Sequence, residues 1–169
     1  EKSYGSHYSH QTEAAWPGYY GVYLSDYNIK VDLAATRRGA YHSYIYPRHE
    51  QSGILIDLEH GINDEVIESS IKMVDAQTIV GFRRSKWFVE DHQYYFYARF
   101  SKPFENVSTY VDGQTGKNTD VKGKAVKMLV QFATEVSENV DVKVGLSTIS
   151  IEGALRNLEK EIPSWGIHK

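Results

Sequence analysis

The sequence predicts an all-β fold, a mainly antiparallel β-sandwich with one helix near its C-terminal end. Segments with period-two alternation, rich in aromatic and β-branched residues, dominate residues 1–147. Short turn sequences separate these segments, and no long helical pattern lies between them. Short strands separated by such turns are typical of antiparallel pairing in a sandwich.

Ten strands are expected, at 19–24, 29–35, 41–46, 53–57, 66–74, 78–84, 93–100, 107–111, 125–133 and 140–146. The strongest turn signals between them are Pro17-Gly18 and the stretches 25–28, 59–64 and 112–118. These stretches are rich in Gly, Asn, Asp and Ser, which tolerate turn conformations or form local hydrogen bonds there.

One helix is expected after the last strand. A stripe of apolar residues spaced for one helix face consists of Ile151, Leu155, Leu158 and Ile162. Ser150 is a suitable N-cap, Glu152 puts negative charge in the first turn, and Pro163 ends the helix.

Composition excludes several classes of function. The net charge is −3, so no basic field for nucleic acid or anionic lipid is expected, and there are no cysteines to form disulfides or bind metal. No apolar run approaches the roughly 20 residues that span a bilayer. Phosphate-binding glycine loops and nucleophile elbows are also missing from the sequence. The 13 tyrosines suit either a tyrosine-rich β domain or a carbohydrate-binding surface.

The first candidate binding residues are Arg83, Arg84 and Trp87, at the end of an expected strand. Two guanidinium groups and an indole ring can bind a sugar through bidentate hydrogen bonds and ring stacking. The alternative is an exposed basic loop whose tryptophan covers the core. Arg38 and His42 form a second pair, four residues apart. An even separation puts them on one face if both lie in a strand, which indicates a solvent face or a polar groove.

The sequence contains two clusters of possible metal ligands, and for each of them a structural role is favoured. Asp57, Glu59 and His60 follow an apolar strand, and a turn role is favoured there over catalysis. His7, His10 and Glu13 lie in a segment whose turn-like composition argues against a stable helix. A solvated or hydrogen-bonding segment is therefore favoured over a zinc site.

Several blocks of residues, in a fixed order along the chain, resemble the N-terminal domain of family 92 glycoside hydrolases, the exo-acting α-mannosidases. The blocks include Pro17-Gly18-Tyr19-Tyr20, Ile56-Asp57-Leu58, Gly81 with Arg83, Ser85 and Trp87, Phe100-Ser101-Lys102-Pro103-Phe104, and Glu161-Ile162-Pro163. The resemblance extends over almost the whole chain.

The resemblance implies a large β-sandwich of the galactose-mutarotase-like type, called a supersandwich. Residues 1–163 would be a partial N-terminal domain without its first part, and 164–169 the start of a linker to an α/α-barrel catalytic domain. It implies that the general acid, the general base and the Ca²⁺ ligands lie outside this chain, which then contains no catalytic or metal-binding residue. The sandwich would contribute substrate contacts, expected at Trp87 and Arg83 or Arg84, with Arg38 and His42 as further candidates.

The parent protein implied by this resemblance is a calcium-dependent, inverting α-mannosidase, with α-1,2 linkages as the expected substrate. It would be secreted or periplasmic and would trim mannose-containing glycans, with the catalytic domain of the same polypeptide as its partner. The chain alone would be inactive. A free-standing carbohydrate-binding or adhesion module is the alternative.

Overall fold

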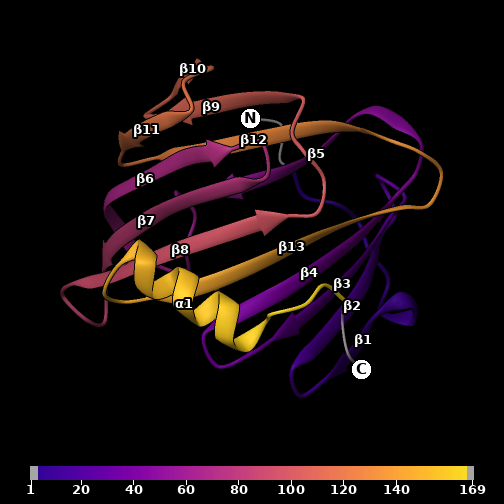
Figure 1. Ribbon diagram of the computed structural model, residues 1–169, viewed down its shortest axis with the longest axis horizontal. Coiled ribbons are helices and arrows are strands. Elements are labelled where there is room, and N and C mark those ends of the chain that lie inside the picture. The colour runs from indigo at the N-terminus through magenta and orange to yellow at the C-terminus, as the bar shows by residue number, and fades with distance from the viewer. Residues whose placement is uncertain (1–3, 167–169) are drawn as a thin grey trace.

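The computed structural model describes residues 4–166, which form two antiparallel β-sheets and one α-helix (Figure 1). The larger sheet has nine strands, in the order β1 (Ala14–Trp16), β2 (Tyr19–Leu24), β3 (Ile29–Ala35), β4 (Gly39–Tyr46), β13 (Glu138–Ser147), β8 (His92–Phe100), β7 (Thr78–Lys86), β6 (Glu65–Asp75) and β11 (Asp120–Gly123). The smaller sheet has four, in the order β10 (Gln114–Gly116), β9 (Asn106–Val111), β12 (Val126–Thr134) and β5 (His49–Asp57). A short 3₁₀ turn, η1 (His10–Thr12), precedes β1. The predicted all-β sandwich is confirmed.

The main core lies between the two sheets. Strand β12 shows why: its residues alternate between buried and half-buried along the whole strand, as the pleat of a half-buried strand requires. Its inward residues Val126, Met128 and Val130 are fully buried. They pack against buried residues of the larger sheet, including Ile71, Ile79, Ala98, Phe100 and Val142.

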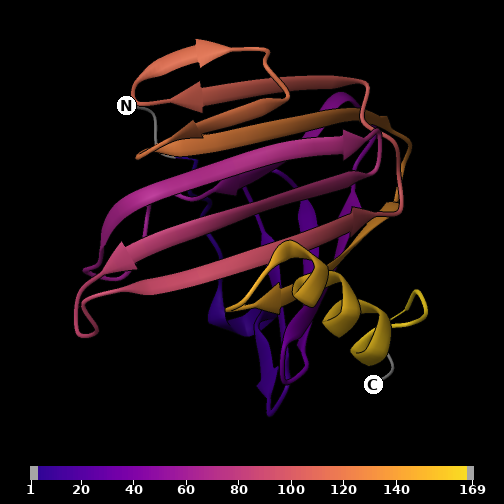
Figure 2. The same ribbon diagram turned by 60° about the vertical axis from the view of Figure 1, so that its left-hand side comes forward.

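Helix α1 (Ile151–Glu161) packs on the other face of the larger sheet, against β13 and β8 (Figure 2). Its predicted N-cap is confirmed, because the Ser150 hydroxyl accepts a hydrogen bond of 3.0 Å from the Gly153 N–H. Leu158 and Ile162 form a small core with Tyr41. Past the helix, the buried Lys143 ammonium donates to the Ile162 carbonyl at 3.2 Å, which suits the negative end of the helix dipole.

All ten expected strands are present, and the structure adds three short ones: β1, β10 and β11. The expectation that 112–118 is only a turn is wrong. Asp112 and Gly113 have φ angles of 48° and 84° and form a two-residue turn, so residues 114–116 return as β10 alongside β9. Strand β5 also begins at His49, four residues before the expected position.

The end of the chain was expected to begin a linker at residue 164. Trp165 lies against the sheet, with its ring centroid 6.3 Å from that of Tyr41 and 4.5 Å from the Lys143 ammonium. Residues 167–169 of the expected linker lie outside the described residues. Within residues 4–166, no helix has the length and apolarity that crossing a membrane requires.

Candidate functional site

The hairpin between β7 and β8 presents large apolar side chains to solvent. Trp87 is 62% exposed and Phe88 is 89% exposed, although both lie in a loop that is otherwise rich in charge. The backbone N–H of Trp87 donates to the Val89 carbonyl at 3.1 Å, which closes a tight turn at the tip. The interpretation of Trp87 as a cover for the core is therefore wrong. We call residues 86–91 the aromatic tip.

Arg83 lies at the base of this hairpin and is engaged inside the chain. Its guanidinium donates two hydrogen bonds to the Asp64 carboxylate, one of 3.1 Å and one shorter. Its Nε donates to the Leu58 carbonyl at 2.8 Å. Both side chains of the pair are largely buried, at 20% and 17% exposed. Arg83 therefore fastens the 58–64 loop to β7 and has a clear structural role.

Arg84 points to the opposite side of β7 and forms a second bidentate pair. Its Nε and one terminal nitrogen donate to the two Asp91 oxygens at 2.8 and 2.7 Å. This pair is exposed and joins β7 to the last residue of the aromatic tip, just before β8 begins. Of the three residues predicted here, Trp87 is the one that projects most into solvent.

Arg38 and His42 do not share a face. Arg38 lies in the turn before β4, and its backbone N–H and Nε donate to Glu161 at the end of α1, at 2.9 and 2.7 Å. His42 lies within β4 and pairs with the Tyr44 hydroxyl at 2.9 Å, on the face opposite the helix. Burial lowers the pKa of His42. The prediction of a common face is wrong because strand alternation does not extend into the turn.

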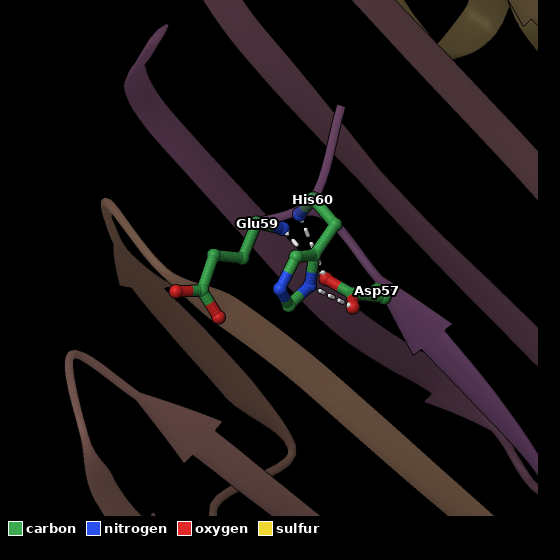
Figure 3. A group of neighbouring side chains, drawn as sticks. All are labelled: Asp57, Glu59 and His60. Carbon is green, nitrogen blue, oxygen red and sulfur yellow. Dashed lines mark hydrogen bonds and ion pairs between the residues drawn. The ribbon is translucent and has the colours of Figure 1, made fainter. Parts of the chain in front are cut away.

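Asp57, Glu59 and His60 lie together at the end of β5 (Figure 3). One Asp57 oxygen accepts from the N–H groups of Glu59 and His60, at 2.8 and 3.1 Å, which is an Asx turn. The other oxygen accepts from the Tyr4 hydroxyl and lies 2.7 Å from the His60 Nδ1. Burial by itself raises the pKa of Asp57, but these hydrogen bonds together hold it well below its usual range. The predicted turn role is confirmed.

His7 and His10 do not converge on one site. His7 pairs with Asp26 at 2.9 Å, whereas His10 pairs with Glu13 at 2.5 Å. Both imidazoles are exposed, and the expectation of a hydrogen-bonding segment is confirmed. The hydrogen bonds of His7 with Ser25 and Asp26 hold the N-terminal segment against the turn that follows β2.

Comparison with known proteins identifies the family. The model of the glycosyl hydrolase family 92 N-terminal domain matches residues 1–147. The chain belongs to glycosyl hydrolase family 92. No curated protein gives a match to it.

Solved structures agree with this family 92 assignment. The α-mannosidase BT3965 from Bacteroides thetaiotaomicron superposes with a TM-score of 0.87 at 29% identity, over 92% of this chain and 22% of that chain. The inverting mannosidase BT2199 from the same organism gives a TM-score of 0.80 at 26% identity, over 92% of this chain and 21% of that chain. A third family 92 hydrolase, ccman5, shares the fold with a TM-score of 0.80. The chain thus spans about a fifth of the length of these relatives.

The cluster at Asp57 does not fit the Ca²⁺ that the resemblance to family 92 implies. Calcium takes six to eight oxygen ligands, whereas this cluster includes an imidazole nitrogen. The Lys127 ammonium also lies 2.8 Å from Glu59 and 3.6 Å from Asp57, where it already neutralises the carboxylates. Among the described residues, this is the only group of three or more side chains close enough to share an ion.

Sequence reasoning missed Phe88 as a member of this family 92 domain's candidate site. Phe88 is the most exposed large apolar residue among those described. A signal was present, because Trp87-Phe88-Val89 lies between Lys86 and Glu90-Asp91. Three consecutive apolar residues within a charged loop cannot all reach the core, since neighbouring side chains point in different directions.

Proposed function

We propose that this chain is the N-terminal domain of a calcium-dependent, inverting exo-α-mannosidase that removes α-1,2-linked mannose from glycans outside the cytoplasm. The observation that carries the proposal is the family match over residues 1–147, supported by similarity to an α-mannosidase and to a mannosidase described as inverting. In inverting enzymes, one carboxylic acid protonates the leaving oxygen while a carboxylate ~6.5–9.5 Å away activates water. We place both groups, and the calcium, in the catalytic domain of the same polypeptide.

The part we assign to this domain is substrate contact through the aromatic tip. Trp87 and Phe88 offer flat, exposed apolar surfaces on a hairpin, and the C–H face of a pyranose packs on such surfaces. A hollow beside Trp87 is lined by Asn63, Glu65, Lys86 and Glu90, whose polar groups can bind sugar hydroxyls. The Arg84–Asp91 pair closes this hairpin, and the Arg83–Asp64 pair fastens the neighbouring 58–64 loop to β7.

The function is tested by incubating the parent polypeptide, and the chain alone, with α-1,2-mannobiose. We expect the parent to release mannose that first appears as the inverted β-anomer in proton NMR spectra, with loss of activity in a calcium chelator. We expect the chain alone to release none. The proposal would be contradicted if the parent hydrolysed no mannobiose of any linkage. It would also be contradicted if the chain alone released mannose.

Replacing Trp87 by alanine in the parent polypeptide is expected to lower kcat/KM for mannobiose about tenfold, which corresponds to ~1.4 kcal/mol. The reason is loss of one stacking surface while the Arg84–Asp91 pair still closes the hairpin. The matched control is Val136→Ala, in a different hairpin. Val136 is 74% exposed, and its replacement is expected to leave kcat/KM unchanged. An unchanged kcat/KM for Trp87→Ala would exclude this contact.

One observation favours the alternative, a free-standing carbohydrate-binding module. Trp16 is 48% exposed and lies flat on Tyr19, with ring centroids 3.9 Å apart and planes 14° apart. A stacked tryptophan with one open face can serve as a sugar platform on the outer side of the larger sheet. Calorimetric titration of the isolated chain with mannobiose distinguishes the two functions. Binding that Trp16→Ala abolishes would support the module.

A further inference from the structure

A hollow of about 360 Å³ lies between the β9–β10 hairpin and β11, at the edge of the molecule where both sheets end (Figure 1). We call it the edge hollow. Strand β6 separates β11 from β7 in the larger sheet, so the edge hollow and the aromatic tip are built by different elements. The lining of the edge hollow includes the polar Thr109, Asp112, Gln114 and Asn118 and the apolar Val111 and Val121.

Thr109 is the buried polar residue of the edge hollow. It is 1% exposed, and no residue within 4–166 forms a hydrogen bond with its side chain. Every fully buried polar side-chain atom in this part of the chain has a partner, so the Thr109 hydroxyl must reach solvent, and it does so in the hollow that Thr109 lines. Gly116 lies opposite Thr109 on β10, and its missing side chain leaves this hydroxyl accessible, since a Cβ there would lie 3.5 Å from Thr109 Oγ1.

Asp112 adds a carboxylate at the hairpin turn. One of its oxygens accepts from the backbone N–H groups of Lys124 and Ala125, at 3.0 and 2.8 Å. Among the described residues, no hydrogen bond uses its other oxygen or the side-chain amides of Gln114 and Asn118. A carboxylate oxygen, two amides and a hydroxyl therefore remain available to a ligand in one hollow.

This set of groups suits a sugar. A sugar hydroxyl both donates and accepts hydrogen bonds, as amide and hydroxyl side chains do, and a carboxylate accepts from it. Val111 and Val121 offer apolar surface to the C–H groups of a ring. An anion is disfavoured because no Lys or Arg of the described residues lines the hollow. A divalent cation such as Ca²⁺ takes six to eight oxygen ligands, for which a single carboxylate is a poor basis.

We infer that the edge hollow is a second carbohydrate-binding site, which takes one sugar residue of a glycan apart from the aromatic tip. The Asp112 carboxylate and the two amides would bind hydroxyls at the rim, and Thr109 would bind the hydroxyl that reaches deepest. The volume favours one ring over a long chain, since it lies at the lower end of the ~300–1,000 Å³ that ligand sites occupy. The inference stands on the lining of the hollow and does not need the proposed mannosidase activity.

Titration of the parent polypeptide with mannose, followed by NMR of its valine methyl groups, tests this site. We expect the methyl signals of Val111 and Val121 to shift together and to saturate in the millimolar range, because an open site gains little from each hydrogen bond. The same shifts are expected in Trp87→Ala, which alters the aromatic tip alone. Absence of saturable shifts would overturn the inference, and so would their loss in Trp87→Ala, since they would then arise from the aromatic tip.

Two substitutions test the lining itself. Thr109→Val removes the hydroxyl and keeps the shape of the side chain, so the dissociation constant for mannose should rise about fivefold. Gly116→Val fills the space over Thr109 from an exposed position and should abolish the shifts. The matched control is Ser108→Ala, which removes a hydroxyl from the neighbouring position of β9, on the other face of the strand, and should change nothing.

The unfolding midpoint of each variant separates lost binding from lost folding. If Thr109→Val unfolds, Gly116→Val still decides the question, because Gly116 is exposed and its replacement leaves the core untouched. Unchanged binding in a folded Thr109→Val and in Gly116→Val would overturn the inference. Saturable shifts with calcium chloride and none with mannose would also overturn it, because the occupant would then be a cation. Mannobiose hydrolysis by the unsubstituted parent provides a separate readout of the proposed function.

Discussion

Replacing Arg83 by methionine is expected to lower the free energy of unfolding by about 2–4 kcal/mol, which urea denaturation of the chain measures. The variant leaves the Asp64 carboxylate without its bidentate partner and the Leu58 carbonyl without its donor. The estimate lies below the loss typical of a fully buried pair, because both side chains remain partly exposed, at 20% and 17%. The matched control is Arg84→Met, which breaks an exposed bidentate pair and should leave stability almost unchanged.

The loss in Arg83→Met should depend on pH. The hydrogen bond from Arg83, aided by Ser85, lowers the pKa of Asp64 to about 2, whereas an unfolded aspartate titrates near ~3.9. A lowered pKa means that the ion pair stabilises the fold fully above pH ~4 and loses this contribution as the pH falls toward 2. The difference between wild type and Arg83→Met should therefore narrow over that range. A constant difference from pH 7 to pH 3 would show that Arg83 acts through packing alone.

The strands that sequence reasoning found are those in which the pattern is long. Nine residues of β12 alternate without a break, and Ile151, Leu155 and Leu158 share one face of α1 with Ile162 just past its end, so tertiary packing reinforces the local signal. The missed strands β1, β10 and β11 have three or four residues each, which is too short for a pattern to be distinguished from a loop. Their pairing depends on a neighbouring strand, which one segment of sequence does not reveal.

The candidate site was predictable by position and less so by role. The sequence indicated the end of β7, and the aromatic tip lies there. Whether Arg83 faces a sugar or a carboxylate depends on where Asp64 lies, 19 residues earlier in a loop whose path depends on the fold. Sequence spacing also placed Arg38 and His42 on one face, but Arg38 lies in the turn before β4, where strand alternation does not apply. A local sequence pattern does not reveal how close two residues lie when a loop separates them.

Replacing Gly145 by alanine is the second substitution with a large expected effect, about 2–3 kcal/mol of lost unfolding free energy. Gly145 lies in β13 beneath α1, and a Cβ at this position would be 2.2 Å from the Ala154 carbonyl oxygen and 2.7 Å from the Leu158 Cβ. Backbone atoms of the helix cannot rotate away as a flexible side chain can, so α1 must move off the sheet. Urea denaturation measures the loss, and faster hydrogen exchange at Leu158 would report the displaced helix.

The matched control for this variant is Gly116→Ala in β10. There the nearest atom to an added Cβ is the Thr109 Oγ1 at 3.5 Å, an ordinary van der Waals contact, so stability should change by less than ~0.5 kcal/mol. Both variants add one methyl group to a strand, and they differ in what lies above it. Equal effects of the two would show that α1 tolerates displacement from β13. A large effect confined to Gly145→Ala would instead establish that close packing on β13 holds α1 in place. The contact between Lys143 of β13 and Trp165, which follows the helix, depends on the same packing.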